Sequence, residues 1–198
     1  MLYKKLNGGG EIHTWFPKSI YHKKISVNNL KQIEKSIKGY GSPVYVRQKT
    51  FEFEVESSYT TQKNPLHKEK KLKLLFNQIL SSAREYCSQL GYSQLFCNDL
   101  QIESSWFNIS KKGDYLQRHI HPNSFLSGVF YIKCDDEDFI RFYDEDMLVL
   151  PSSYNDLSFT NTTYVCEPGT LLLFKSNLPH STNKQISKEK IVISFNIK

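Results

Sequence analysis

Apolar residues recur with a helical period in the first half of the chain. Within residues 26–38 they form one face of a helix, with Ser26 as a candidate N-cap and Gly39 as a candidate stop. A second, longer helix is predicted to begin at Pro65 and to end at Gly91. Its apolar stripe comprises Leu72, Leu75, Phe76, Ile79, Ala83, Tyr86, Cys87 and Leu90.

From residue 100 the apolar period changes from 3.6 to 2, which is typical of strands. The alternation predicts that Ile102, Ser104, Trp106 and Asn108 share one strand face. Further strands are predicted at 125–133, 139–144, 163–167, 170–175 and 190–198, with one or two more within 42–57.

This order of elements predicts a mostly β fold with N-terminal helices, in which the strands build a sandwich, jelly roll or barrel. We expect one domain over residues 1–198, with a helix-rich supporting part at 1–99 and a β core at 100–198. The polar segment 145–162 is predicted to be a long loop, a class of segment that is often functional.

Composition adds limits to this picture. The formal net charge is +6, and part of the excess lies in the basic segment 63–73, which either binds an acidic partner or is the solvated face of a helix. The four cysteines contain no C-x-x-C pair, so we expect buried thiols. No apolar run has the length of a membrane span and no signal peptide is recognisable, which predicts a cytoplasmic protein without a membrane partner.

Two histidines stand one residue apart before an apolar run, at His119 and His121. Side chains at i and i+2 of an extended segment point the same way, so both imidazoles can face one metal. His180, directly after another apolar run, is the candidate third ligand. Three protein ligands leave positions open for catalysis, whereas a structural site is closed. The alternatives are a pair of ordinary surface histidines, or Asp144 or Asp146 in the place of His121.

The order of motifs resembles the iron(II)/2-oxoglutarate-dependent oxygenases over about residues 100–198. It is most similar to a branch found in phages and marine bacteria, related to the prolyl-hydroxylase group, that carries an H-x-H-P-N-S…S-G-V-x-Y block. The residues that carry the resemblance are Trp106, Asn108, His119, His121, Pro122, Asn123, Ser124, Ser127, Gly128, Val129, Tyr131, Pro168, Gly169, Leu173, Phe174, Ser176, Leu178, His180, Lys190, Ser194, Phe195 and Asn196.

The resemblance implies a double-stranded β-helix in which His119, His121 and His180 hold iron(II). It implies that Lys190 binds the distal carboxylate of the cosubstrate 2-oxoglutarate (2OG). The implied reaction uses O2, converts 2OG to succinate and carbon dioxide, and hydroxylates a C–H bond. Candidate hydrogen-bonding residues around the cosubstrate are Asn108, Tyr115, Ser127 and Tyr131.

Several positions depart from the family pattern. Most members have Asp or Glu where His121 stands, and the branch usually has an Arg-x-Ser pair where this chain has Lys190 and Val192. The substrate class (protein side chain, nucleic acid or small molecule) and the oligomeric state stay open. If a phage encodes the chain, the expected location is the host cytoplasm.

Two other classes of protein stay open. Gly113 and the H-x-H pair fit the opening of a cupin motif, which would give a metal-binding enzyme or binding module without 2OG. However, Phe125 and Leu126 stand where that motif has a glutamate, and Gly169 lies too far before His180. The third class is a jelly-roll scaffold in which the histidines bind no metal.

Overall fold

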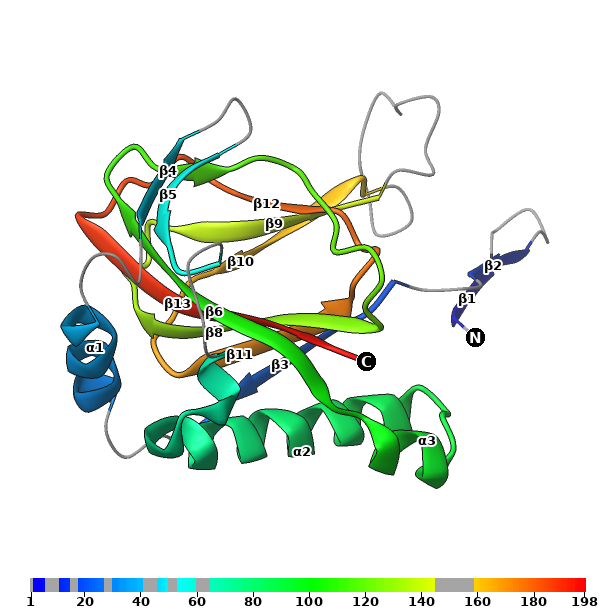
Figure 1. Cartoon of the computed structure of the whole chain (residues 1–198). Helices are drawn as coiled ribbons and strands as arrows, with labels where there is room; N and C mark the ends of the chain where they lie inside the picture. Colours follow the sequence, from blue (N-terminus) through cyan, green and yellow to red (C-terminus); the bar gives the residue numbers. More distant parts are fainter. Residues whose placement is uncertain are drawn as a thin grey trace.

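Two antiparallel sheets form the body of the protein (Figure 1). The computed structural model describes residues 2–5, 11–14, 18–26, 30–40, 46–49, 53–59, 65–144 and 159–198. The predicted loop at 145–162 therefore lies largely outside the described residues, as do Asp146 and residues 63–64 of the basic segment.

The larger sheet has eight strands, and the central β13 pairs with β6 on one side and β8 on the other. In spatial order this sheet contains β3 (Ile20–Lys24), β11 (Thr170–Lys175), β8 (Leu126–Lys133), β13 (Glu189–Ile197), β6 (Ile102–Lys111), β5 (Phe53–Ser57) and β4 (Val46–Lys49), with β7 (Tyr115–Leu116) paired to β5. The smaller sheet has the order β10 (Asn161–Val165), β9 (Phe139–Tyr143) and β12 (His180–Thr182). In a separate two-stranded sheet, β1 (Leu2–Lys5) pairs with β2 (Glu11–Thr14) in antiparallel fashion.

The helices cover the face of the larger sheet that points away from the smaller sheet (Figure 1). They are α1 (Leu30–Gly39), α2 (Lys73–Gln89) and α3 (Gln94–Asp99), and the 3-10 turns η1 (Leu66–Lys68) and η2 (Lys70–Leu72) precede α2. The stripe predicted for the long helix is confirmed, because its residues from Leu72 to Cys87 are buried. The α-helix itself begins only at Lys73, so most of the described basic segment lies in the 3-10 turns with its lysines exposed.

Strand alternation divides the interior into two hydrophobic clusters. On β13, Ile191, Ile193 and Phe195 point toward the helices, whereas Val192 belongs to the cluster between the two sheets. Phe107 and Ile109 of β6 join the helix-side cluster in the same way. The opposite faces of these strands are therefore available to line a site between the sheets.

The expectation that Ile102 shares a face with Trp106 is wrong, because Ile102 packs against the helix-side cluster. The cause is a bulge in β6: Asn196 of β13 is paired with Ser104, but the next residue, Ile197, is paired with Ile102. The extra residue, Glu103, reverses the side-chain alternation at this point. Ser104, beyond the bulge, still lies on the Trp106 side and accepts a hydrogen bond from Asn196.

The other predicted strands are confirmed within one or two residues, but α3, β3, β7 and β12 carry signals too short to be found from the sequence. All four cysteines are free and buried, as expected. None of the helices among the described residues is long and apolar enough to span a membrane.

Candidate metal centre

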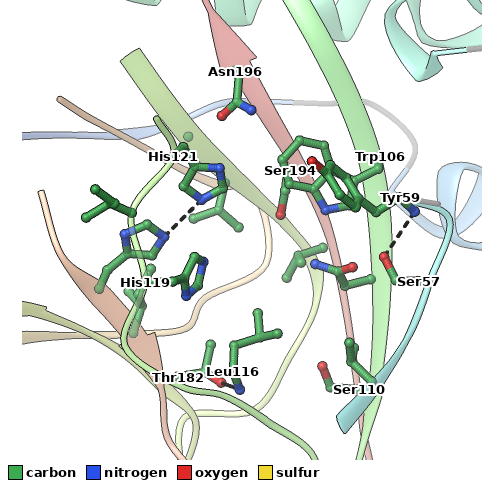
Figure 2. Close-up of a pocket in the computed structure, with 18 of the residues that line it drawn as sticks. Ser57, Tyr59, Trp106, Ser110, Leu116, His119, His121, Thr182, Ser194 and Asn196 are labelled. Atoms are coloured by element: carbon green, nitrogen blue, oxygen red, sulfur yellow. Dashed lines mark hydrogen bonds between the residues drawn. The ribbon is translucent and has the colours of Figure 1, made fainter. Parts of the chain in front are cut away.

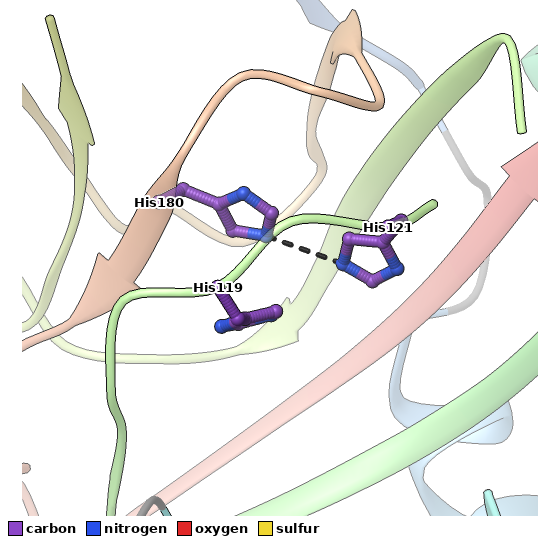
Figure 3. A group of neighbouring side chains, drawn as sticks. All are labelled: His119, His121 and His180. Atoms are coloured by element: carbon purple, nitrogen blue, oxygen red, sulfur yellow. Dashed lines mark hydrogen bonds between the residues drawn. The ribbon is translucent and has the colours of Figure 1, made fainter. Parts of the chain in front are cut away.

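Three histidines from two distant segments converge between the sheets (Figure 3). One ligand atom from each of His119, His121 and His180 lies within 4.8 Å of the corresponding atoms of the other two. Within the described ranges this is the one group of three or more metal-ligating side chains that lie so close together. The structure thus brings together the three residues predicted from the sequence.

Backbone hydrogen bonds hold the two histidine segments side by side. His119 and His180 form an isolated antiparallel bridge, in which the amide of each donates to the carbonyl of the other at 3.0 Å. The amide of His121 donates to the carbonyl of Ser176 at 2.9 Å. Asn123 then takes a left-handed conformation, with φ of 71°, that Asn tolerates better than most residues. The H-P-N-S motif therefore turns the chain from the ligand segment into β8.

The second nitrogen of two of the imidazoles is bound to the backbone, which fixes the tautomer. Nδ1 of His119 donates to the carbonyl of Gln117 at 2.7 Å, and Nδ1 of His180 donates to that of Leu178 at 2.9 Å. In this tautomer the lone pair lies on Nε2, the nitrogen that would bind a metal. Nε2 of His121 lies 3.3 Å from Nε2 of His180. Two imidazole nitrogens on one ion at about 2.1 Å lie roughly 3.0–3.4 Å apart, so the donor set fits a metal.

The environment keeps the imidazoles of His121 and His180 neutral. Burial, and secondarily the neighbouring His119, lowers the pKa of His121 to about 4 and that of His180 to about 3. Trp106 stacks on His121 and Phe174 packs edge-on against His180, which supplies the apolar surroundings. A metal ion therefore meets little competition from protons near neutral pH.

The histidines lie in the wall of a cavity of about 540 Å³ between the sheets (Figure 2). One row of its lining comes from alternate residues of β13: Lys190, Val192, Ser194 and Asn196. Adjacent rows come from β6 and β8, including Asn108 and Tyr131. Residues near the opening include Tyr59 and Ile120, whose exposed fractions are 61% and 47%.

Lys190 is the most unusual residue of this lining, because only 4% of its surface is exposed. Throughout the part of the chain that the structure describes, no carboxylate lies within ion-pair distance of its ammonium group. Burial of a cation without a counter-ion is costly. The cavity therefore contains an unneutralised positive charge that suits an anionic ligand.

The other predicted cosubstrate contacts divide into two groups. Asn108 and Tyr131 line the cavity and are buried, and burial raises the pKa of the Tyr131 phenol well above its usual value. Tyr115 and Ser127 do not line it. In β7 the adjacent Leu116 takes the lining position, and Ser127 is instead hydrogen-bonded to Ser176 and to the side chain of Asn196.

The acidic alternative to His121 is not supported where the structure describes it. Asp144 binds Lys18 at 2.6 Å and is not part of the histidine group.

Two residues of the cavity lining, Ser194 and Asn196, were given no role in the predictions from the sequence. Their two-residue spacing from Lys190 along one strand was the signal that could have placed them there.

Comparisons with known proteins agree with this geometry. Residues 104–196, slightly less than half of the chain, match the model of the family described as "Putative 2OG-Fe(II) oxygenase". No curated protein matches the chain.

Solved structures resemble nearly the whole chain. A Pseudomonas putida prolyl-4-hydroxylase matches with a TM-score of 0.61 and 12% identity over 91% of this chain and 92% of that one. A viral collagen prolyl hydroxylase from Paramecium bursaria Chlorella virus-1, in complex with 2OG, matches with a TM-score of 0.56 and 15% identity over 90% and 94%. The epimerase SnoN in complex with Fe3+, alpha-ketoglutarate and nogalamycin RO matches with a TM-score of 0.63. The identity is 10% over 91% of this chain and 78% of that one.

The matched segment contains the three histidines, Lys190 and the β13 row of the cavity. The chain therefore has the jelly-roll fold of the 2OG-Fe(II) oxygenases.

Proposed function

We propose that this protein is an iron(II)- and 2OG-dependent oxygenase, in which His119, His121 and His180 bind iron and Lys190 binds the distal carboxylate of 2OG. The observation that carries the proposal is the combination, in one cavity, of three converging imidazoles and a buried lysine that has no carboxylate partner among the described residues. Three imidazoles alone would suit several metals. The unneutralised ammonium group adds the requirement for an anionic cosubstrate.

In this proposal the metal and cosubstrate supply the oxidation, and the protein supplies the groups that bind and enclose them. When bound, iron(II) with 2OG and O2 supplies an oxidative decarboxylation to succinate and carbon dioxide that is coupled to hydroxylation of a substrate C–H bond. The protein's residues hold the ligand nitrogens in place through the carbonyls of Gln117 and Leu178. Lys190 offers a charge-assisted hydrogen bond, the strong kind, to the cosubstrate. Val192 and Phe174 contribute apolar lining that limits the water around it.

The all-histidine ligand set has a thermodynamic consequence. Neutral ligands leave the +2 charge of the ion uncompensated, whereas a set with one carboxylate would reduce it. Binding of the 2OG dianion supplies this compensation. We therefore expect iron and 2OG each to raise the affinity of the protein for the other.

Iron binding tests the proposal directly. Wild-type protein is expected to bind one iron(II) per chain under anaerobic conditions, and His180→Ala is expected to bind almost none. His22→Ala is the matched control, because His22 is exposed on β3 and lies outside the histidine group. Equal iron content in wild type and His180→Ala would contradict the assigned ligands. Iron binding without any effect of 2OG would favour the cupin-type alternative.

A further inference from the structure

One end of the cavity contains polar groups that the proposed cofactors do not use. Trp106, Ser194 and Asn196 all line it, and Figure 2 shows them on the side that faces His121. Trp106 and Ser194 are paired residues of β6 and β13, and Asn196 follows on the same face of β13. We call these three residues the polar patch.

The hydrogen-bonding capacity of this patch is incompletely used. Trp106 as a whole residue is 7% exposed, and its indole N–H has no acceptor among the described residues. The hydroxyl of Ser194 has no partner there either. The indole nitrogen is not among the fully buried side-chain atoms that lack a partner, so its N–H is accessible from the cavity. Asn196 accepts from Ser127 at 2.8 Å and donates to Ser104 at 3.1 Å, which orients its amide and leaves one N–H available. The patch therefore offers donors from all three residues, and the amide of Asn196 is held in a fixed orientation.

Asn196, at the far end of this patch, lies beyond the reach of a cosubstrate that is bound to Lys190. Asn196 lies six residues along β13 from Lys190, a distance of about 20 Å in an extended strand. A lysine side chain of about 6 Å, a hydrogen bond of about 3 Å and a five-carbon chain of about 6 Å together reach about 15 Å from the backbone of Lys190. Trp106 stacks on His121, so the patch begins at the level of the metal ligands and continues beyond them.

The charges of the cavity limit what can bind there. Its described lining contains the cations Lys190 and Arg118 and not a single carboxylate. A cationic substrate is thus disfavoured, whereas an oxygen acceptor without positive charge is favoured. At the opening, the exposed ring of Tyr59 lies against Trp106 with centroids 4.9 Å apart and offers an apolar surface.

We infer that the polar patch of Trp106, Ser194 and Asn196 binds the carbonyl oxygen of an uncharged, amide-bearing substrate and places its neighbouring C–H bond beside the metal. This inference rests on the proposed function for the reaction, but the binding itself does not require catalysis. The donors recognise the carbonyl, and the absence of carboxylates from the described lining disfavours a charged amine relative to an amide.

The indole N–H signal of Trp106 gives a direct measurement by NMR, because the chain has only two tryptophans and Trp106→Phe assigns the signal. The full-length protein is loaded with zinc(II), which is diamagnetic, and titrated with N-methylacetamide in the presence and absence of 2OG. A saturable downfield shift of the Trp106 signal is expected, with no such shift on titration with propylammonium. Absence of the shift from folded wild-type protein would overturn the inference.

Asn196→Asp tests the donor without a large change of shape, since Ser104 and Ser127 can both donate to a carboxylate. The affinity for N-methylacetamide is expected to fall roughly two- to tenfold, the value of one hydrogen bond, and propylammonium is expected to gain binding. Asn177→Asp is the matched control, because Asn177 is exposed and outside the cavity lining. Equal affinities for both ligands in wild type and folded Asn196→Asp would contradict the role of Asn196.

Two further comparisons separate the possible results. N-acetyl-trialanine methylamide identifies a polypeptide source if it also shifts the amides of Tyr59 and Ile120, and a small-molecule source if it shifts Trp106 alone; both results support carbonyl binding. An amide shift in protein whose own spectrum does not change when 2OG is added supports the patch and contradicts the proposed cosubstrate. Binding of 2OG without an amide shift contradicts the patch and leaves the proposed function intact.

Discussion

At the scale of single residues, burial of the Lys190 charge makes the empty cavity energetically unfavourable. Its neighbours on β6 and β8 contribute neutral side chains to the lining, and its charge is removed from water. The same group that destabilises the empty protein should stabilise the complex with a dianion. Function and stability are therefore expected to respond in opposite directions when this charge is removed.

Lys190→Met keeps the aliphatic stem and deletes the ammonium group. We expect the affinity for 2OG to fall about ten- to hundredfold, because a hydrogen bond to a charged group is lost. We expect the melting temperature of the metal-free protein to stay equal or to rise. Calorimetric titration with 2OG and thermal unfolding measure the two effects.

Lys188→Met is the control for this change, since Lys188 is exposed and precedes the same strand. It should alter neither quantity beyond a small surface effect. A large loss of stability in Lys190→Met, with unchanged affinity for 2OG, would show that the lysine has a structural role only.

At the scale of elements, the close approach of β8 and β13 depends on a glycine. Gly128 is paired with Phe195, and a Cβ atom added at Gly128 would lie 2.4 Å from the Phe195 ring and 2.8 Å from the carbonyl oxygen of Leu172. The S-G-V and S-F-N motifs are thus two halves of one packing contact. This contact sets the spacing of the strands that carry Lys190 and the polar patch.

Gly128→Ala is therefore expected to reduce the free energy of unfolding by about 1–3 kcal/mol, the usual effect of overpacking. Gly39→Ala at the end of α1 is the matched control, because a Cβ there meets nothing within 4 Å. Urea unfolding of both variants measures the difference. Equal stability of the two would mean that β8 and β13 can separate without cost.

Some of these elements could be predicted from the sequence, and others could not. The period of apolar residues predicted the long helix and the strands of the jelly roll, because the buried face of an element determines the spacing of its apolar residues. The third ligand, His180, was found only through its position after an apolar strand. The bulge at Glu103 and the short strands β7 and β12 depend on pairing with distant segments, which local spacing does not record.

At the scale of the whole molecule, the two hydrophobic clusters should exclude solvent independently of each other. Cys87 and Cys97 belong to the helix-side cluster, whereas Cys134 and Cys166 belong to the cluster between the sheets. Burial raises the pKa of the Cys87 thiol to about 11 and that of Cys134 to about 12. Neither group forms the reactive thiolate near pH 8.

Ellman's reagent is therefore expected to modify none of the four cysteines of the native protein at pH 8 and all four in denaturant. Rapid modification of the native protein would contradict a closed interior. Mass spectrometry of the modified residue would then identify which of the two clusters opens.

The most direct test of the central claim is anaerobic titration of the iron(II)-loaded protein with 2OG, followed by visible spectroscopy. A bidentate 2OG chelate of iron(II) gives a charge-transfer band in this range. We predict that the band appears and saturates at one 2OG per chain, and that His121→Ala, which removes one of the three ligands, abolishes it. Failure of the band to appear in iron-loaded wild-type protein would contradict the assignment of this cavity to 2OG.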